Sequence, residues 1–175
     1  YESSKIQVNA CLVKEWCRSP HQGKMNLDEW LKEEKIPGLE GIDTRQLTII
    51  TREAGTLRAV ICTDGKITPK QGIQKAKKME WPSDSNLVSM VSTKRKYKRG
   101  NEGPKITLFD WGVKRSIVRN LAKKCQVTVV PWNYNIEKVK ATKPKLVFMS
   151  NGPGDPDHED MKLVVNTVKN IVKEI

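Results

Sequence analysis

Three short apolar segments in the second half of the chain, each followed by a helical pattern, constrain the fold more than any other feature. The apolar segments span residues 105–110, 126–132 and 144–150, and the helical patterns span 113–125, 135–141 and 160–175. Strands that alternate with helices are typical of a parallel sheet with crossover helices. The nearly continuous apolar strands agree, because parallel strands are buried on both faces. The sequence therefore predicts an α/β fold here, in the order βαβαβα.

The first half of the chain mixes strand and helix patterns without a repeat. Alternating residues predict a strand over 5–13, and a second short strand is expected over 57–62. Helices are expected over three ranges, which are 26–35, 44–54 and 69–79. Asn26 and Asp43 are the expected N-caps of the first two helices, and Gly55 is expected to end the second. This half is therefore expected to be a mixed α/β domain.

A basic segment, Thr93–Lys105, separates the two halves. Its glycine, its proline and its lack of an apolar period favour a linker over a nucleic-acid-binding arm. The chain has 32 Lys and Arg against 20 Asp and Glu, a net charge of +12, so a basic nucleic-acid-binding protein stays an alternative. Tyr97 is the one aromatic residue of the segment, which weakens that alternative. The predicted domains are 1–93 and 105–175, with 94–104 as linker.

The cysteines and histidines form no pattern that is typical of a metal site or a disulfide framework. They are Cys11, Cys17, Cys62, Cys125, His21 and His158. None of the cysteines has C-x-x-C spacing, so reduced thiols and no metal are expected. No apolar stretch approaches the roughly 20 residues that span a bilayer. The charged first residues do not resemble a signal peptide. The expectation is a cytoplasmic protein without a membrane partner.

The segment LVFMSNGPGDPDHEDM, residues 146–161, contains the most specific turn chemistry of the chain. Gly152 and Gly154 can adopt dihedral angles that are closed to other residues, and they allow a ligand to approach the backbone. Pro153 and Pro156 restrict the turn between them. The segment follows the third strand, and the carboxyl ends of parallel strands form the usual ligand crevice. Two interpretations stay open from this pattern: backbone donors for an oxyanion, or a stiff connection without a function.

Four segments carry a family resemblance. MSNGPGDP resembles the signature of class I glutamine amidotransferase domains. FDWGVKRSIVRNLAKKCQVTVVPWN resembles the opening of that domain in the small, glutaminase subunit of carbamoyl-phosphate synthetase. YESSKIQVNACLVKEW and LEGIDTRQLTIITREAGTLRAVI resemble the N-terminal domain of the same subunit. The chain is identified as a member of this family that covers part of the N-terminal domain and the beginning of the class I glutamine amidotransferase domain.

The resemblance implies a ligase subunit that hydrolyses glutamine and supplies ammonia to a large subunit. There, ATP, Mg²⁺ and bicarbonate would give carbamoyl phosphate for arginine or pyrimidine synthesis, so no cofactor is expected on this chain. The backbone of Gly152 and Gly154 would contact glutamine. The family's catalytic Cys, His and Glu, with the Cys in a G-x-C-x-G elbow, have no counterpart in residues 1–175. The chain alone is therefore expected to be an inactive fragment. The alternative is a non-catalytic module that only contacts a large subunit.

Overall fold

The structure, a computed structural model, describes residues 2–3, 5–19 and 25–174 and divides the chain into two compact units. Unit 1 comprises Ser3–Glu80, and unit 2 comprises Trp81–Ile175 together with Glu2. The boundary between the two units falls between Glu80 and Trp81. The sequence predicts the end of the first domain later, at residue 93. The domain ranges 1–93, 94–104 and 105–175 stay a prediction. His21 lies outside the described residues.

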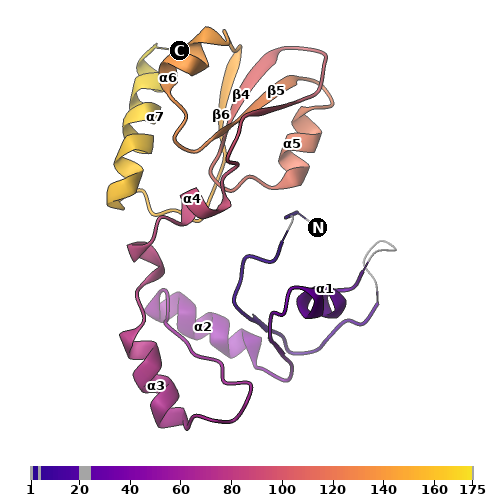
Figure 1. Cartoon of the computed structure of the whole chain (residues 1–175), viewed down its shortest axis with the longest axis vertical. Coiled ribbons are helices and arrows are strands. Elements are labelled where there is room, and N and C mark those ends of the chain that lie inside the picture. The colour runs from indigo at the N-terminus through magenta and orange to yellow at the C-terminus, as the bar shows by residue number, and fades with distance from the viewer. Residues whose placement is uncertain (1, 4, 20–24, 175) are drawn as a thin grey trace. The chain divides into compact units, whose positions relative to one another are not determined.

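Unit 2 is built on a four-stranded sheet with the strand order β3-β5-β4-β6 (Figure 1). The strands are β3 (Tyr97–Arg99), β4 (Lys105–Asp110), β5 (Gln126–Pro131) and β6 (Leu146–Met149). β4 pairs in parallel with both β5 and β6, so that Ile106 lies opposite Val127 on one side and Leu146 on the other. The three predicted parallel strands are therefore confirmed, and the fold is α/β.

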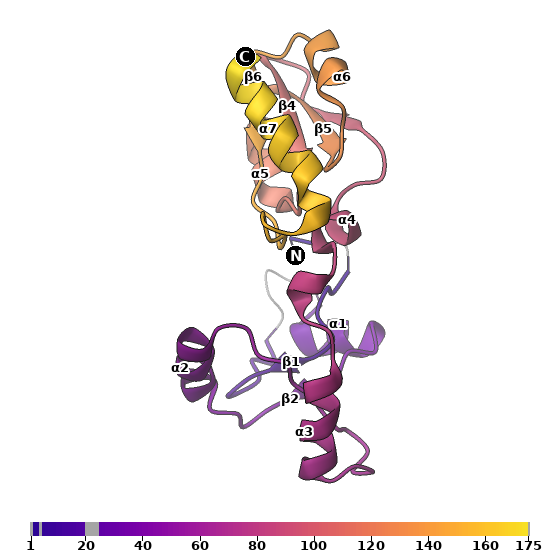
Figure 2. The same ribbon diagram turned by 90° about the vertical axis from the view of Figure 1, so that its left-hand side faces the viewer.

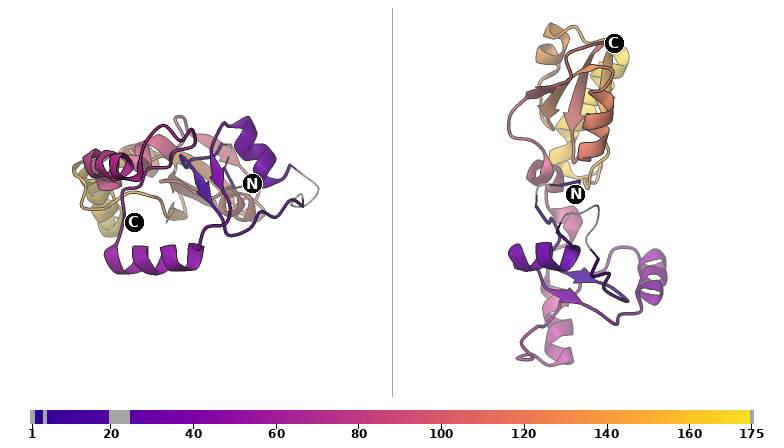
Figure 3. Two further views of the ribbon diagram at one scale, coloured as in Figure 1. Left: turned by 90° about the horizontal axis from the view of Figure 1, so that it is seen from below. Right: turned by 90° about the vertical axis from the view of Figure 1, so that its right-hand side faces the viewer.

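Helices cover both faces of this sheet. They are α5 (Arg115–Leu121), α6 (Ile136–Ala141) and α7 (Lys162–Glu174). On one face, Leu108, Val127 and Val129 pack against α5, and on the other face Phe109 and Val130 pack against α6 and α7. Figure 2 shows α7 in front of the strands, and the right-hand view of Figure 3 shows α5 on the opposite side. Successive strand residues point to opposite faces, so the apolar run of β4 serves both cores.

The expected linker contains a strand. β3 pairs antiparallel with β5, with Tyr97 opposite Val129 and Arg99 opposite Val127. Tyr97 also packs against the core beneath α5. Residues 97–99 of the segment 94–104, which the sequence predicts as a linker, therefore form an edge strand of the sheet of unit 2. Three residues are too few to show the alternating pattern of a strand in the sequence. The strand forms because the backbone of β5 pairs with it.

Three further elements of unit 2 were not expected from the sequence. They are a short helix, α4 (Leu87–Val91), and two single 3-10 turns, Pro82–Asp84 and Glu159–Met161. Val88 of α4 is buried against Met161 and Val164 at the start of α7. α4 therefore lies beside the segment that follows β6.

In its described residues, unit 1 has three helices whose ends follow the predicted caps. They are α1 (Leu27–Glu33), α2 (Thr44–Ala54) and α3 (Pro69–Lys78). Asn26 accepts a hydrogen bond from the Glu29 N–H at 2.9 Å, and Asp43 accepts one from the Gln46 N–H at 2.9 Å. Gly55 follows α2 with φ 76°. The three predicted helices are confirmed.

The strands of unit 1 differ from the prediction. A two-residue strand, β1 (Cys11–Leu12), pairs in parallel with β2 (Gly38–Leu39) (Figure 2). The expected strand over 5–13 is therefore much shorter, and the expected strand over 57–62 is absent from the described structure. An alternating pattern indicates a preference for an extended backbone, but a strand also needs a hydrogen-bonding neighbour.

Candidate functional site

The segment after β6 lies at the carboxyl edge of the parallel strands and is fixed there by Ser150. This side chain is buried, with 4% of its surface exposed. Its Oγ accepts a hydrogen bond from the Trp111 N–H at 3.0 Å and donates one to the Asn151 carbonyl oxygen at 2.9 Å. Trp111 directly follows β4. The loop after β6, which we call the glycine loop (residues 150–156), is thus attached to the loop after the neighbouring strand.

Asp110 fixes the loop after β4 in turn. One carboxylate oxygen accepts hydrogen bonds from the N–H groups of Gly112 and Val113 at 3.0 and 2.9 Å. The other oxygen accepts one from the Thr93 N–H at 2.8 Å. Asp110 is buried, so these three donors satisfy a carboxylate that has little contact with water. Three separate segments are therefore held together at the carboxyl edge of the sheet.

Glycine is required at position 152 because no side chain fits there, and not because the backbone has an unusual dihedral angle. A methyl group built on Gly152 would overlap the carbonyl oxygen of Trp111 and lie 2.7 Å from its carbonyl carbon. A methyl group on Gly154 would overlap Val88 of α4. Neither glycine has φ in the left-handed region, so the expectation of unusual dihedrals at these two positions is wrong. The glycine that needs such a dihedral is Gly112, with φ 118°.

The glycine loop presents free backbone donors. Within the described part of the chain, the N–H groups of Gly152 and Gly154 donate no hydrogen bond to another protein atom. Gly152 is exposed and Gly154 is half-buried. Because a free N–H group can bind a carbonyl oxygen, a carboxylate or an oxyanion, this loop has the chemistry of a site for such a group.

A cavity of about 370 Å³ adjoins the glycine loop within unit 2. Its walls come from the loop, Trp111, α4 and α7, and they include Gly152, Gly154, Val88, Met161 and Val168. The walls are mostly apolar, and Lys169 contributes a charged group. Cavities of this size are large enough for a small molecule. The carboxyl edge of the sheet therefore combines free donors with space for a ligand.

None of the four cysteines is a residue of the glycine loop. Cys125 precedes β5 and thus lies at the opposite, amino edge of the parallel strands. Cys11 belongs to β1, and Cys17 and Cys62 are exposed in unit 1. Cys62 donates a hydrogen bond to Asp64, whose pKa is lowered by hydrogen bonds from the Lys66 N–H and then from Cys62. In the described residues, no cysteine is hydrogen-bonded to a histidine.

The single described histidine, His158, has a structural partner. Its Nδ1 accepts a hydrogen bond from the Asp160 N–H at 3.2 Å, at the start of a 3-10 turn. No cluster of three or more metal-binding side chains occurs among the residues that the structure describes. Over the same residues, no helix has the length and apolar character to cross a membrane.

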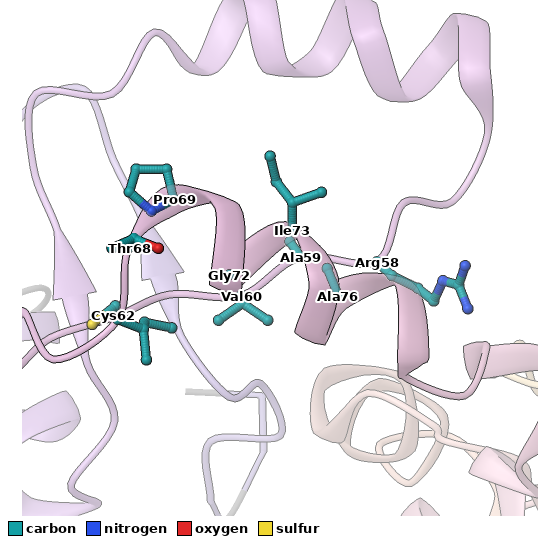
Figure 4. A pocket seen from close by; sticks show the side chains of 10 residues that line it. Arg58, Ala59, Val60, Cys62, Thr68, Pro69, Gly72, Ile73 and Ala76 are labelled. Atoms are coloured by element: carbon teal, nitrogen blue, oxygen red, sulfur yellow. The ribbon is translucent and has the colours of Figure 1, made fainter.

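A second cavity, of about 330 Å³, lies within unit 1 between α3 and the extended segment 58–62 (Figure 4). Figure 4 shows Val60 and Cys62 on the extended segment, beside Ile73 and Ala76 of α3. The Arg58 guanidinium donates a hydrogen bond from Nη1 to the Met79 carbonyl oxygen at 2.7 Å. This cavity contains none of the residues that the sequence singles out for binding.

Sequence reasoning identified the two glycines but not the residues that hold their loop. Ser150, Asp110 and Trp111 stand in the quoted segments FDWG and MSNG, yet their types alone do not indicate a role. A polar residue at the end of an apolar run is the signal that could have found them, since Asp110 is the last residue of β4 and Ser150 directly follows β6.

Two protein families match separate parts of the chain. The CPSase domain of the carbamoyl-phosphate synthase small chain matches residues 1–61, and the class I glutamine amidotransferase family matches residues 107–175. The second match contains the whole glycine loop.

Curated relatives agree with both matches. A carbamoyl phosphate synthase small chain of Clostridium perfringens is 41% identical over 175 residues, which cover 98% of this chain and 48% of the relative. A protein of the same name from Bacillus caldolyticus is 40% identical over 100% of this chain and 48% of its own length. A carbamoyl phosphate synthase pyrimidine-specific small chain of Bacillus subtilis is 37% identical. The chain spans about half the length of these relatives.

Proposed function

Because the chain belongs to the family of carbamoyl phosphate synthase small chains, we propose that it carries the glutamine-binding loop of a glutamine-hydrolysing subunit. In this proposal the subunit releases ammonia from glutamine and supplies it to a large subunit in the cytoplasm. The large subunit binds ATP and Mg²⁺ and makes carbamoyl phosphate from bicarbonate, for pyrimidine or arginine synthesis. The similarity to a pyrimidine-specific small chain supports the first of these pathways.

The observation that supports this proposal most is the pair of free N–H groups on Gly152 and Gly154, beside a cavity at the carboxyl edge of the sheet. Hydrolysis of an amide passes through a tetrahedral intermediate whose oxygen carries negative charge. Rigid backbone donors stabilise that charge without reorganisation during the reaction. We assign Gly152 to this oxygen and Gly154 to the bound glutamine. Ser150 positions the loop through its hydrogen bonds to Trp111 and Asn151.

The nucleophile is expected to come from outside these 175 residues. An activated cysteine needs a base such as His within hydrogen-bonding distance. No described cysteine has one, and Cys125 lies at the amino edge of the sheet, away from the glycine loop. The proposal therefore includes that this chain alone does not hydrolyse glutamine.

The test uses a chimera in which these 175 residues replace the matching half of the Clostridium perfringens small chain, assembled with its large subunit. Gly152→Ala is compared with Gly72→Ala, because a methyl group on Gly72 has 4.0 Å to its nearest neighbour, Ile67. Gly152→Ala is expected to displace the loop, because the methyl group overlaps the Trp111 carbonyl oxygen, and so to move the donor N–H away from the oxyanion. The expected loss of glutamine-dependent rate is roughly a hundred- to thousandfold, the usual effect of losing an oxyanion donor. Gly72→Ala is expected to have no effect.

Ammonium salt as nitrogen source separates chemistry from folding in this test. External ammonia does not need the glycine loop, so the ammonia-dependent rate of Gly152→Ala is expected to equal that of the unmodified chimera. Equal losses with both nitrogen sources would show that the loop is only a structural turn or a subunit contact. Glutaminase activity of the 175-residue chain that disappears on replacing one of its cysteines would contradict the assignment of the nucleophile.

A further inference from the structure

The amino edge of the parallel sheet, opposite the glycine loop, gathers positive charge. β4 and β6 begin at this edge, β5 begins there after α5, and the antiparallel β3 ends there. Six cationic residues flank these strand ends, and we call them the basic edge. They are Arg99, Lys105, Lys123, Lys124, Lys143 and Lys145.

Backbone contacts show that the segments of the basic edge are direct neighbours. The Lys145 N–H donates a hydrogen bond to the Lys105 carbonyl oxygen at 2.8 Å. The Gln126 N–H donates one to the Pro104 carbonyl oxygen at 3.0 Å. A methyl group built on Gly103 would lie 3.0 Å from the Lys124 carbonyl carbon. The loops before β4, β5 and β6 therefore form one continuous surface.

The charge of the basic edge is not balanced within the described structure. All six side chains are exposed, and none forms an ion pair with a described acidic residue. Residues 94–145 contain fifteen Lys and Arg but three acidic residues. Of these, Asp110 is buried at the other edge and Glu137 pairs with Lys140 at 3.1 Å, which leaves Glu102. Residues 146–174, which include the glycine loop, contain more acidic than basic residues.

We propose that the basic edge binds the phosphate backbone of double-stranded nucleic acid, without reading its sequence. Neighbouring strands lie about 4.8 Å apart, so the four strands of this edge span roughly 14 Å. A duplex of that length carries about eight phosphates, at one charge per roughly 1.7 Å. The duplex therefore offers enough phosphates for six cations. Such contacts carry affinity but no base specificity.

The residue types distinguish this partner from others. Five of the six residues are lysines, and lysine is depleted in protein–protein interfaces, where aromatic residues and Arg are enriched. Single strands are usually bound by exposed aromatic rings on which bases stack. The aromatic ring next to Arg99 is that of Tyr97, which is half-buried, and the Arg99 guanidinium lies 5.1 Å from its ring centre. A duplex backbone needs no such ring.

The linear sequence does not reveal this surface. The sequence favours the run Thr93–Lys105 as a linker rather than a nucleic-acid-binding arm. This run contributes only Arg99 and Lys105 to the basic edge. The other four residues come from two different connections, before β5 and before β6. The proposal is independent of glutamine binding, because the two sites lie at opposite edges of the sheet.

The experiment measures binding of the 175-residue chain to a fluorescent 30-base-pair DNA duplex by anisotropy, between 50 and 200 mM KCl. Six phosphate contacts predict a slope of about −5 in a plot of log K against log salt, and an affinity roughly a thousandfold weaker at the higher salt. The test variant combines Lys105→Gln, Lys123→Gln, Lys124→Gln and Lys145→Gln. With two contacts left, its affinity is expected to change only about tenfold over the same range.

A matched control removes the same charge from unit 1. It combines Lys70→Gln, Lys75→Gln, Lys77→Gln and Lys78→Gln, four exposed positions of α3. This variant is expected to keep the slope and the affinity of the unmodified chain. Circular dichroism of both variants checks that they fold. Equal losses in the two variants would show attraction by net charge alone, and the proposal would fail.

Three other results would also overturn the proposal. The first is absence of saturable binding at 50 mM KCl. The second is equal or tighter binding of a single strand, which would indicate recognition of bases. The third is displacement of the labelled duplex by poly-glutamate or anionic vesicles as effectively as by unlabelled duplex, at equal concentration of negative charge. That result would assign the basic edge to an acidic protein or a membrane surface.

Discussion

Units 1 and 2 contain similar amounts of chain but very different amounts of core. Twelve of the thirteen buried hydrophobic side chains of the described residues belong to unit 2, and Leu31 is the one in unit 1. Unit 2 has a four-stranded sheet with helices on both faces, whereas the sheet of unit 1 is one pair of two-residue strands. Large apolar side chains are exposed in both units, for example Ile50 and Ile73 in unit 1 and Leu163 and Val172 in unit 2, so the difference lies in the buried core.

The helices of unit 1 show that local signals form elements without a large core. α1 and α3 each begin with a reciprocal capping box, Asn26 with Glu29 and Thr68 with Gln71. Such a cap satisfies two backbone donors and stabilises a helix by about 1 kcal/mol. Burial of a whole side chain contributes more, about 1.5–3 kcal/mol. The comparison indicates that local capping defines the helices of unit 1 and that burial stabilises unit 2.

The largest expected effect is the difference between two identical substitutions, Leu108→Ala in unit 2 and Leu57→Ala in unit 1. Leu108 is fully buried between β5 and α5, whereas Leu57 is 43% exposed. Leu108→Ala is expected to lower the free energy of unfolding of unit 2 by about 2–5 kcal/mol, through lost transfer energy and a cavity. Leu57→Ala is expected to cost less than about 1 kcal/mol. Urea unfolding measures both, and equal costs would contradict the difference in burial.

A smaller effect is expected from two matched caps, Asn26→Ala in unit 1 and Asn135→Ala in unit 2. Asn26 accepts from the Glu29 N–H, and Asn135 accepts from the Glu137 N–H at 2.7 Å. Each loss is expected to cost about 1 kcal/mol. Each helix has one buried side chain, Leu31 in α1 and Val139 in α6, but only Val139 belongs to a core cluster on the sheet. Amide exchange is therefore expected to rise more in α1 than in α6. A larger rise in α6 would show that its core contact contributes less than its cap.

The smallest effect concerns pH and Tyr97. Burial, and then the charge of Asp110, raises the pKa of the Tyr97 phenol above its ordinary value of 10.0. The folded chain therefore retains this proton more strongly than the unfolded chain. The protonated Tyr97 phenol therefore contributes to the free energy of unfolding. This contribution is complete below pH 10 and is lost as the pH rises through the pKa of the folded chain. The free energy of unfolding is expected to fall less steeply above pH 10 in Tyr97→Phe than in the unmodified chain. Parallel curves from urea unfolding would refute the raised pKa.

The sequence alone determined the features that depend on neighbouring residues. The helix caps at Asn26 and Asp43, the helix end at Gly55 and the three parallel strands follow from hydrogen bonds and apolar periods within a few residues. The family resemblance likewise identified the glycine loop as the candidate site. These signals are local, so one sequence is enough to read them.

The tertiary structure decided everything that needs a distant partner. Residues 5–13 and 57–62 prefer an extended backbone, but a strand forms only where another backbone pairs with it, as β3 does with β5. Gly152 is explained by the carbonyl group of Trp111, which a methyl group would overlap, and not by its own dihedral angle. The lysines of the basic edge lie in separate connections, and only the parallel order of β5, β4 and β6 brings their charges to one side of the sheet.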